Sequence, residues 1–345
     1  GTPLGRITQQ KKKFNEKMSV QSAFQYNAAP LCGNDGGFTK ISIIKRLPDI
    51  LDTVIEHNKT SLSSQQLESL NTLREELSKG VISSLRLSDD DNNEEHTEWK
   101  EFEQIFNVES RTWLELPWFF VENYFYKLIL DVMKYRVNLV DPFERQKSQS
   151  LEQALQSGAA SSIANTVHDY LISDSVVNNN DFLVYLLAID LWGNKADLSF
   201  SGGAASKDEE IREHRESELR SDYIVSNDSQ IAIDRILDGS VRSYNFILDN
   251  CGLEVVCDLF FAHCLLERFN AQRITFYVKT EPVFVSDVMT KDLHFTIDQL
   301  INYTSDERIQ SFGKLFKQNV EQGKWLIQEH RFFTSPLPFY EMPND

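Results

Sequence analysis

Two apolar strands separated by one apolar helix constrain the fold of this chain more than any other feature. Tyr244–Leu248 and Ile274–Val278 are short, buried-type runs typical of strands, and Leu253–Phe269 between them has the length and pattern of a helix. A further helix is predicted over Ser286–Asn302. Strand, helix, strand and helix at this spacing indicate a βαβ unit, in which the strands are parallel. We therefore expect an α/β fold with a mainly parallel sheet.

The chain before this unit has helical periodicity. Apolar residues recur at helical spacing over Ser64–Lys79, from Trp118 to about Arg136, and over Phe182–Trp192, where Gly193-Asn194 is expected to end the helix. Strands are expected mainly after residue 240. The predicted organisation is a disordered leader at 1–30, a helical N-terminal region at 31–180 and an α/β domain at 181–345.

Composition argues against several classes of protein. The net charge of −17 repels a phosphate backbone and no basic stripe offsets it, so nucleic-acid binding is not expected. No segment reaches the roughly 18 apolar residues of a membrane span, and the N-terminus lacks the apolar centre of a signal peptide. The four cysteines form no Cys-x-x-Cys pair, which favours a reduced, cytoplasmic setting without zinc or disulfides. Cys257 and Cys264 are expected to be buried on one helix face. The oligomeric state stays open.

The end of the first strand carries a candidate metal site. Asp249 and Asn250 offer a carboxylate and an amide oxygen, which are hard donors suited to Mg²⁺ or Mn²⁺. An Asp-Asn turn that caps the next helix explains the pair equally well. Asp287 follows the second strand, and alone it is more typical of a helix cap.

Parallel topology favours the metal interpretation, because the carboxyl ends of the strands meet at one edge of the sheet. Asp249, Asn250 and Asp287 could then hold one divalent cation and leave positions for water and phosphate. Lys279, at the end of the second strand, would be a charge partner for the phosphate.

Several motifs together resemble a known family. The motifs are Pro117-Trp118 with Glu122 and Tyr126; Trp192-Gly193-Asn194-Lys195 with Asp197-Leu198-Ser199; Leu248-Asp249-Asn250 with Gly252; Phe276-Tyr277 with Lys279-Thr280 and Val285-Ser286-Asp287; and Gly323-Lys324-Trp325 with Met342-Pro343. In this order and spacing, over about residues 30–345, they resemble the damage-control phosphatase family. The similarity is to its sugar-phosphate phosphatase branch, which includes acidic-residue methyltransferase-like proteins.

The resemblance implies a helical N-terminal region followed by a Rossmann-like α/β/α core. It implies a divalent metal (Mn²⁺, Ni²⁺, Co²⁺ or Mg²⁺) bound by Asp249, Asn250 and Asp287. The implied reaction is hydrolysis of small phosphorylated metabolites such as fructose 1-phosphate or fructose 6-phosphate. Asn194 and Asp197 would line the substrate pocket, as would Glu122.

The chain departs from the family pattern in two places. Lys127 stands where the family has an arginine, and lysine cannot bind a phosphate through two parallel hydrogen bonds. Family chains also continue past the position of Asp345 with a further strand and a Gly-Asp-x-Asn-x-Arg-Lys segment. The metal-binding domain is therefore expected to be incomplete at its C-terminus, and a catalytically weak fragment is one alternative.

Three other functions compete. An S-adenosylmethionine-dependent protein carboxyl methyltransferase is disfavoured because no Gly-x-Gly loop follows the first strand. A phosphatase of the haloacid dehalogenase type is disfavoured because Cys251 occupies the position where a second aspartate would act as general acid. A non-catalytic binding protein remains the third alternative.

Overall fold

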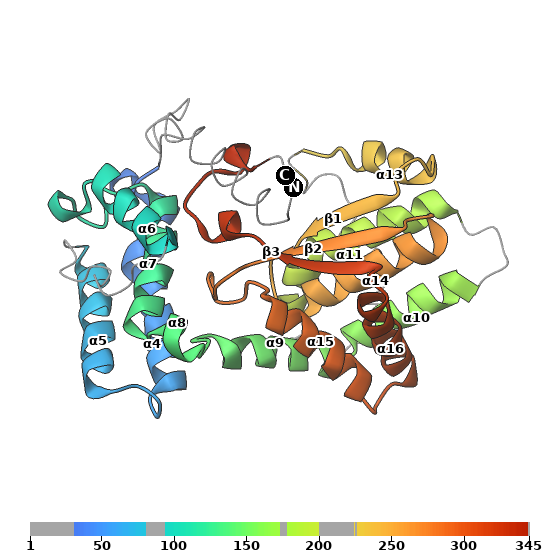
Figure 1. Ribbon diagram of the computed structural model, residues 1–345, viewed down its shortest axis with the longest axis horizontal. Coiled ribbons are helices and arrows are strands. Elements are labelled where there is room, and N and C mark those ends of the chain that lie inside the picture. Colours follow the sequence, from blue (N-terminus) through green and yellow to red (C-terminus); the bar gives the residue numbers. More distant parts are fainter. Residues whose placement is uncertain (1–30, 81–93, 173–177, 200–223, 225, 344–345) are drawn as a thin grey trace, which may run out of the picture. The chain divides into compact units, whose positions relative to one another are not determined.

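The computed structural model describes residues 31–80, 94–172, 178–199, 224 and 226–343, without the side chains of 94–95 and 194–199 (Figure 1). Its contacts divide the chain into two compact units. One unit consists of Gly1–Pro142 with Thr334–Asp345, and the other of Phe143–Phe333. We call them the helical unit and the sheet unit and describe each by itself.

The described part of the helical unit consists mainly of helices. They are α3 (Gly37–Ile41), the π-helix η2 (Ser42–Arg46), α4 (Leu47–Asn58), α5 (Ser64–Lys79), α6 (Glu94–Ile105), α7 (Trp118–Val132) and α8 (Tyr135–Asn138), with short 3₁₀ turns at Gly33–Asp35, Val108–Ser110 and Phe339–Glu341. Helix α5 has the predicted bounds, because Ser63 and Gln66 form a capping box at its start and Gly80 ends it with φ of 64°. Helix α7 is shorter than predicted, since Lys134 adopts φ of 54° and ends the helical path before Arg136.

The sheet unit contains three strands and seven helices in its described residues. The elements are α9 (Glu144–Gln156), α10 (Ala159–Ile172), α11 (Asn179–Ser199), α13 (Ser229–Leu237), β1 (Ser243–Ile247), α14 (Leu253–Arg268), β2 (Arg273–Val278), α15 (Thr290–Asn302), α16 (Glu307–Glu321) and β3 (Trp325–Glu329), with a 3₁₀ turn at Arg331–Thr334.

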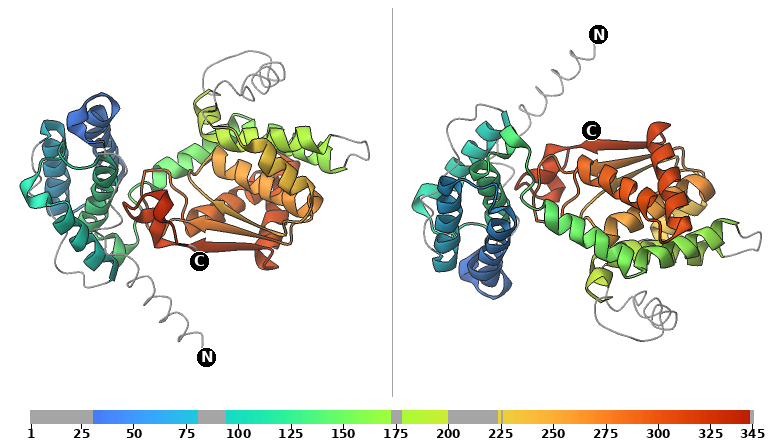
Figure 2. Two further views of the ribbon diagram at one scale, coloured as in Figure 1. Left: turned by 90° about the horizontal axis from the view of Figure 1, so that it is seen from above. Right: turned by 90° about the horizontal axis from the view of Figure 1, so that it is seen from below.

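The strands form one parallel sheet in the order β1-β2-β3 (Figures 1 and 2). Phe246, Phe276 and Ile327 are aligned across it and share one face. Helices α14 and α16 meet above this face, where Phe260 contacts Phe312 and Phe316 at centroid distances of 4.9 and 5.3 Å. These aromatic contacts join the strands and helices in one core. The predicted α/β class with a parallel sheet is confirmed.

Three local features differ from the sequence predictions. Strand β3 was not predicted, because its run Trp-Leu-Ile-Gln-Glu is short and ends in polar residues. Helix α11 continues past Gly193 to Ser199, so the end of the helix expected at Gly193-Asn194 is wrong. Helix α15 begins at Thr290 rather than Ser286, since Asp287 lies in an isolated β-bridge.

Helices α9 and α10 belong to the sheet unit, where α10 packs against both α14 and α16. A domain boundary near residue 180 therefore stays a proposal, and the packing groups residues from Phe143 onward with the strands. Cys257 and Cys264 are buried on α14, as predicted, and neither forms a disulfide.

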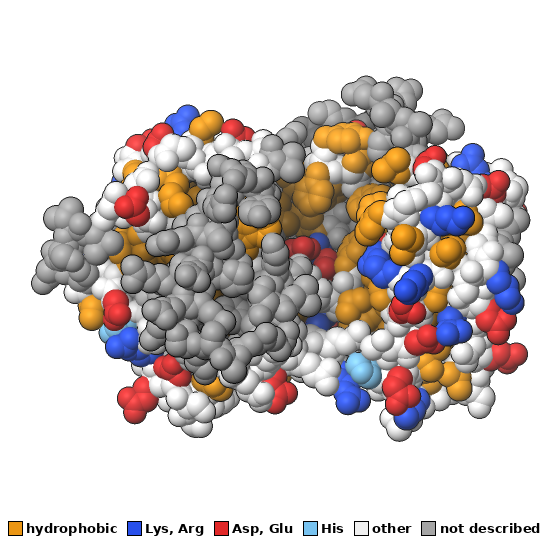
Figure 3. Space-filling model, turned by 180° about the vertical axis from the view of Figure 1, so that it is seen from behind, with side chains coloured by type: hydrophobic (Ala, Val, Ile, Leu, Met, Phe, Trp, Pro, Cys, Tyr) orange, Lys and Arg blue, Asp and Glu red, His pale blue; other side chains and the backbone are white. Residues whose placement is uncertain are grey.

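The described surface mixes both signs of charge. On the face drawn in Figure 3, lysine and arginine side chains are interspersed with acidic ones. Among the residues that the structure describes, no helix combines the length and apolarity needed to cross a bilayer.

Candidate active site

The chain leaves β1 through a turn that places polar side chains at the carboxyl edge of the sheet. Leu248 still donates its N–H to the carbonyl of Tyr277 in β2, and Asp249 and Asn250 follow it. Gly252 adopts φ of 95° and ψ of −140°, a conformation that only glycine adopts easily, and α14 begins immediately afterwards. This turn therefore fixes where the Asp249 and Asn250 side chains leave the sheet.

The segment after β2 returns to the same turn. Asn250 and Asp287 are opposite one another in an antiparallel bridge, which puts their Cα atoms roughly 5 Å apart. Val288 donates to the Asp249 carbonyl at 2.8 Å, and Cys251 donates to the Ser286 carbonyl at 2.7 Å. The structure thus brings together the three residues that the sequence suggested as metal ligands.

The backbone before Asp287 is strained. Phe284 and Val285 have φ of 50° and 70°, in the left-handed region. A β-branched residue is a rare occupant of that region, where the conformation costs on the order of 1–3 kcal/mol. Such strain is often found at functional sites. Here the left-handed conformation of these two residues turns the chain back toward β1.

Helix capping does not explain these three residues. The N-cap of α14 is Gly252 and that of α15 is Met289, and neither helix receives a side-chain cap from Asp249, Asn250 or Asp287. The alternative that the sequence left open, a turn that merely caps the next helix, is therefore not what the structure contains.

Asn250 connects the acidic groups of the site. Its amide nitrogen donates to Asp249 Oδ2 at 3.0 Å and to Glu254 Oε2 at 3.1 Å. Its amide oxygen accepts a 2.5 Å hydrogen bond from Ser286 Oγ. A carbonyl oxygen has two lone pairs, so Asn250 Oδ1 keeps one for a cation. Asp249 is exposed, and its carboxylate is accessible to a ligand.

Asp287 is buried beside a lysine. Its Oδ2 lies 3.0 Å from Lys279 Nζ, but it accepts no well-directed hydrogen bond within the described residues. Burial, together with the charge of Asp249, raises the pKa of Asp287 to about 7, although Lys279 acts in the opposite direction. The Lys279 ammonium also lies 5.7 Å from the centre of the Phe333 ring.

More carboxyl groups continue along α14. Burial raises the pKa of Glu254, and Asp249 adds to the effect. Burial also raises the pKa of Asp258 and of Asp190, which approaches it from α11, and two carboxyl groups so close to one another cannot easily ionise together. This accumulation of carboxyl groups, together with an Asp287 oxygen that lacks a well-directed hydrogen bond and an available lone pair on Asn250, fits a divalent cation held by oxygen donors.

Of the remaining predicted site residues, Glu122 belongs to the helical unit, and Asn194 and Asp197 belong to helix α11. Glu122 is buried in the helical unit, where its Oε1 accepts from Ser42 Oγ at 2.5 Å and from Trp118 Nε1 at 3.0 Å and pairs with Arg46. Lys127 is buried in the same unit. Asn194 and Asp197 lie outside the described side chains.

Sequence reasoning missed two members of the site. Glu254 accepts both the backbone N–H of Asn250 at 3.2 Å and its side-chain amide, and Ser286 binds the amide oxygen. A signal existed for Glu254, because an acid in the first turn after Gly252 must lie beside the Asp249–Asn250 turn. Ser286 gave no such signal, since its hydrogen bond to Asn250 depends on the left-handed backbone at Phe284 and Val285.

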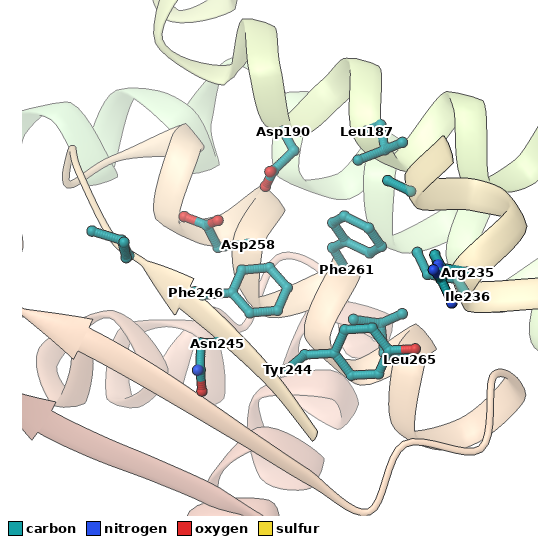
Figure 4. A pocket seen from close by; sticks show the side chains of 12 residues that line it. Leu187, Asp190, Arg235, Ile236, Tyr244, Asn245, Phe246, Asp258, Phe261 and Leu265 are labelled. Atoms are coloured by element: carbon teal, nitrogen blue, oxygen red, sulfur yellow. The ribbon is translucent and has the colours of Figure 1, made fainter. Parts of the chain in front are cut away.

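A pocket of about 450 Å³ lies beside β1 in the same unit (Figure 4). Figure 4 shows Asp190 and Asp258 directed toward one another from α11 and α14, with Phe246 and Phe261 below them. No predicted metal ligand lines this pocket. Asp258 does line it, and the negative charges of Glu254 and Asp249 help to raise the pKa of its carboxyl group.

Comparison with known proteins identifies the family. Residues 43–345 match the damage-control phosphatase ARMT1-like domain. The chain is 29% identical to damage-control phosphatase ARMT1 of Macaca fascicularis over 349 residues, covering 91% of this chain and 77% of that protein. The human protein of the same name is 29% identical over 350 residues with the same coverage, and that of Danio rerio is 28% identical over 345 residues, covering 90% and 75%.

A solved structure of a DUF89 family protein from Pyrococcus horikoshii is similar at 15% sequence identity with a TM-score of 0.44, covering 85% of this chain and 73% of that one. The α/β assignment above depends on the parallel strands themselves. The match over residues 43–345 is decisive for identity. This chain belongs to the family of ARMT1-like damage-control phosphatase domains.

Proposed function

We propose that the chain is a metal-dependent phosphatase that hydrolyses small sugar phosphates such as fructose 1-phosphate or fructose 6-phosphate. Asp249, Asn250 and Asp287 would hold one divalent cation, with Mn²⁺, Ni²⁺, Co²⁺ and Mg²⁺ as candidates. The observation that carries the proposal is the convergence of these three residues at one turn, where none of them caps a helix.

The proposed cation would offset the negative charge of a phosphomonoester as it shifts toward the leaving oxygen. The protein's residues hold and orient the donors. Glu254 fixes the Asn250 amide nitrogen and Ser286 its oxygen, so the oxygen keeps one direction toward the site. Lys279 places a positive charge against Asp287 and favours the ionised carboxylate that a metal ligand requires.

Positive charge at this edge also matters for the substrate. A chain with net charge −17 repels a phosphate dianion in general, so binding needs positive charge at the site itself. Lys279 and a bound cation would supply it together. The roles of Asn194, Asp197 and Glu122 in binding the sugar remain part of the proposal.

The test is metal content and phosphate release in an Asp249→Ala variant, with Asp298→Ala as the matched control. Asp298 is an exposed acid on α15 that pairs with Lys317 in the same unit. We expect Asp249→Ala to lose bound Mn²⁺ and at least 100-fold in phosphate release from fructose 1-phosphate, without unfolding, because Asp249 is exposed. Asp298→Ala should retain both properties.

Activity should require a divalent metal and no methyl donor. Equal metal content and rate in Asp249→Ala and the parent protein would contradict the metal assignment. Phosphate release that persists after complete chelation would contradict metal dependence.

A further inference from the structure

Helix α9 contributes a buried lysine that the proposed chemistry does not use. Lys147 is 4% exposed, and its Nζ lies 2.7 Å from Oδ2 of Asp292, which is also buried. The bond joins residues 145 positions apart within the sheet unit. A buried ammonium loses several kcal/mol of hydration, so it persists only with a well-placed partner.

Asp292 uses the same oxygen to hold the start of α15. Its Oδ2 accepts the N–H of Met289 at 3.0 Å, and its own N–H donates to the Met289 carbonyl. Met289 lies opposite Lys279 in a parallel bridge. The Lys147–Asp292 pair is therefore linked through Met289 to Lys279, the residue that follows β2.

Val288, between Asp287 and Met289, forms hydrogen bonds through both its backbone N–H and its carbonyl. Val288 donates to the Asp249 carbonyl at 2.8 Å and accepts from the Lys279 N–H at 2.9 Å. The segment Ser286–Met289 is thus held at one end by the β1 turn and at the other by Asp292. The strain at Phe284 and Val285 opposes this arrangement, so the segment needs anchors on both sides.

We propose that Lys147 is a positioning residue for the Asp287 ligand. Through Asp292 it holds the segment Ser286–Met289 against the ends of β1 and β2, and so presets the distance from Asp287 to Asp249 and Asn250. This inference rests on the proposed function for its effect on metal binding, but its effect on the segment can be measured separately.

A second lysine on the same carboxylate provides a matched control. Lys291 lies 2.6 Å from Asp292 Oδ1 and is 38% exposed, and it also pairs with Glu144 at the surface. It therefore contacts the oxygen that does not hold Met289. The Lys291 ammonium is partly exposed to water, which weakens its ion pairs, so Lys291→Met should leave the segment in place.

The experiment compares Lys147→Met and Lys291→Met in two measurements. Amide hydrogen exchange of residues 286–289 is followed without metal, and Mn²⁺ affinity is measured by calorimetry. For Lys147→Met we expect exchange about 10-fold faster or more, and Mn²⁺ affinity weakened about 10- to 100-fold, the range typical for groups that orient metal ligands. Lys291→Met should change both by less than about 3-fold.

A double variant covers the case in which Lys147→Met does not fold. Lys147→Met with Asp292→Asn removes both buried charges while an amide oxygen can still cap Met289, and its Mn²⁺ affinity should fall by a similar factor. Equal exchange rates and affinities in Lys147→Met and Lys291→Met, or parental affinity in the folded double variant, would overturn the inference.

The two proposals can fail separately. If the parent protein binds no Mn²⁺ but Lys147→Met still accelerates exchange at 286–289, the metal assignment is wrong and the anchoring role of Lys147 stands. If the parent binds Mn²⁺ and the two lysine variants bind it equally, only the anchoring role is wrong.

Discussion

Asn250 is the residue around which the candidate site is arranged. Its backbone N–H, amide nitrogen and amide oxygen contact Glu254, Asp249 and Ser286. An aspartate at this position would add a fourth negative charge beside Asp249, Glu254 and Asp287 and could not donate to any of them. The neutral amide joins the acidic groups without adding to their repulsion, which explains why this position suits asparagine.

His263 makes the stability of the sheet unit depend on pH. Its ring lies against Phe312 and Phe316, its Nδ1 has no partner among the described residues, and burial lowers its pKa to about 4. The unfolded chain, with an ordinary histidine pKa near 6.5, then binds more protons than the native state between about pH 4 and 6.5. Stability is therefore complete above pH 6.5 and falls as the pH drops toward 4.

Replacing His263 by leucine removes this titration. Relative to the variant, the parent protein should lose about 2 kcal/mol of unfolding free energy between pH 7 and pH 5. Urea unfolding of both proteins at the two pH values measures the difference. A difference in the free energy of unfolding between parent and variant that is the same at both pH values would show that His263 is not buried as a neutral group.

At the residue scale, the sequence predicted which oxygen-bearing side chains would come together but not which residues surround them. Asp249, Asn250 and Asp287 could be predicted because oxygen donors after consecutive parallel strands must come near one edge. Ser286 could not, because its bond to Asn250 depends on left-handed backbone at Phe284 and Val285, which non-glycine residues rarely adopt.

The packing of α11 on α14 depends on a glycine within a helix. A Cβ added at Gly193 would lie 2.8 Å from Cα of Glu254, in the first turn of α14. The two helices therefore meet closely at the turn that orients Asn250. This contact also explains why glycine is tolerated inside α11 and does not end it.

Gly193→Ala tests this packing, because the close approach predicts a loss of stability where alanine in place of a helical glycine normally gives a gain. An alanine inside a helix normally stabilises it by up to about 1 kcal/mol relative to glycine. Here we expect destabilisation of about 1–3 kcal/mol, because the backbone of Glu254 cannot move aside easily, together with weaker Mn²⁺ binding.

Gly158→Ala serves as the control for that variant. Its added Cβ would meet nothing within 4 Å, although φ of 82° imposes a backbone cost. It should therefore destabilise the protein and leave Mn²⁺ affinity unchanged. Thermal unfolding and calorimetry distinguish the variants, and a stabilised Gly193→Ala would refute the close approach.

At the element scale, hydrophobic periodicity predicted which helices and strands exist better than it predicted the residues at which they end. Strands β1 and β2 and helix α14 lie within a residue or two of their predicted bounds, since their apolar runs are long or uninterrupted. The end of α11 and the start of α15 depended on contacts from distant parts of the chain, at Glu254 and Asn250. Local sequence contains no information about such contacts.

At the scale of the whole molecule, the candidate ligands all belong to one of the two units. Asp249, Asn250 and Asp287 lie within Phe143–Phe333, as do Lys147, Lys279 and Asp292. The sequence predicted a helical part followed by an α/β part, but the packing of α9 and α10 with the sheet could not be read from their amphipathic pattern alone. Which surface an apolar helix face meets is decided by tertiary contacts.

This division predicts how metal affects unfolding of the complete chain. A ligand that binds only the native state adds RT ln(1 + [L]/Kd) to stability, or about 2.7 kcal/mol when its free concentration is 100 times Kd. Because all three candidate ligands lie in the sheet unit, Mn²⁺ should raise the unfolding temperature of that unit. Calorimetric scans of the parent protein with Mn²⁺ and with a chelator should differ in the transition of the sheet unit, which hydrogen exchange of β1 and β2 identifies. The transition of the helical unit should stay in place, and Asp249→Ala should show no metal-dependent shift. An equal shift of both transitions would mean that the units unfold together, and a shift that survives in Asp249→Ala would place the metal elsewhere in the protein.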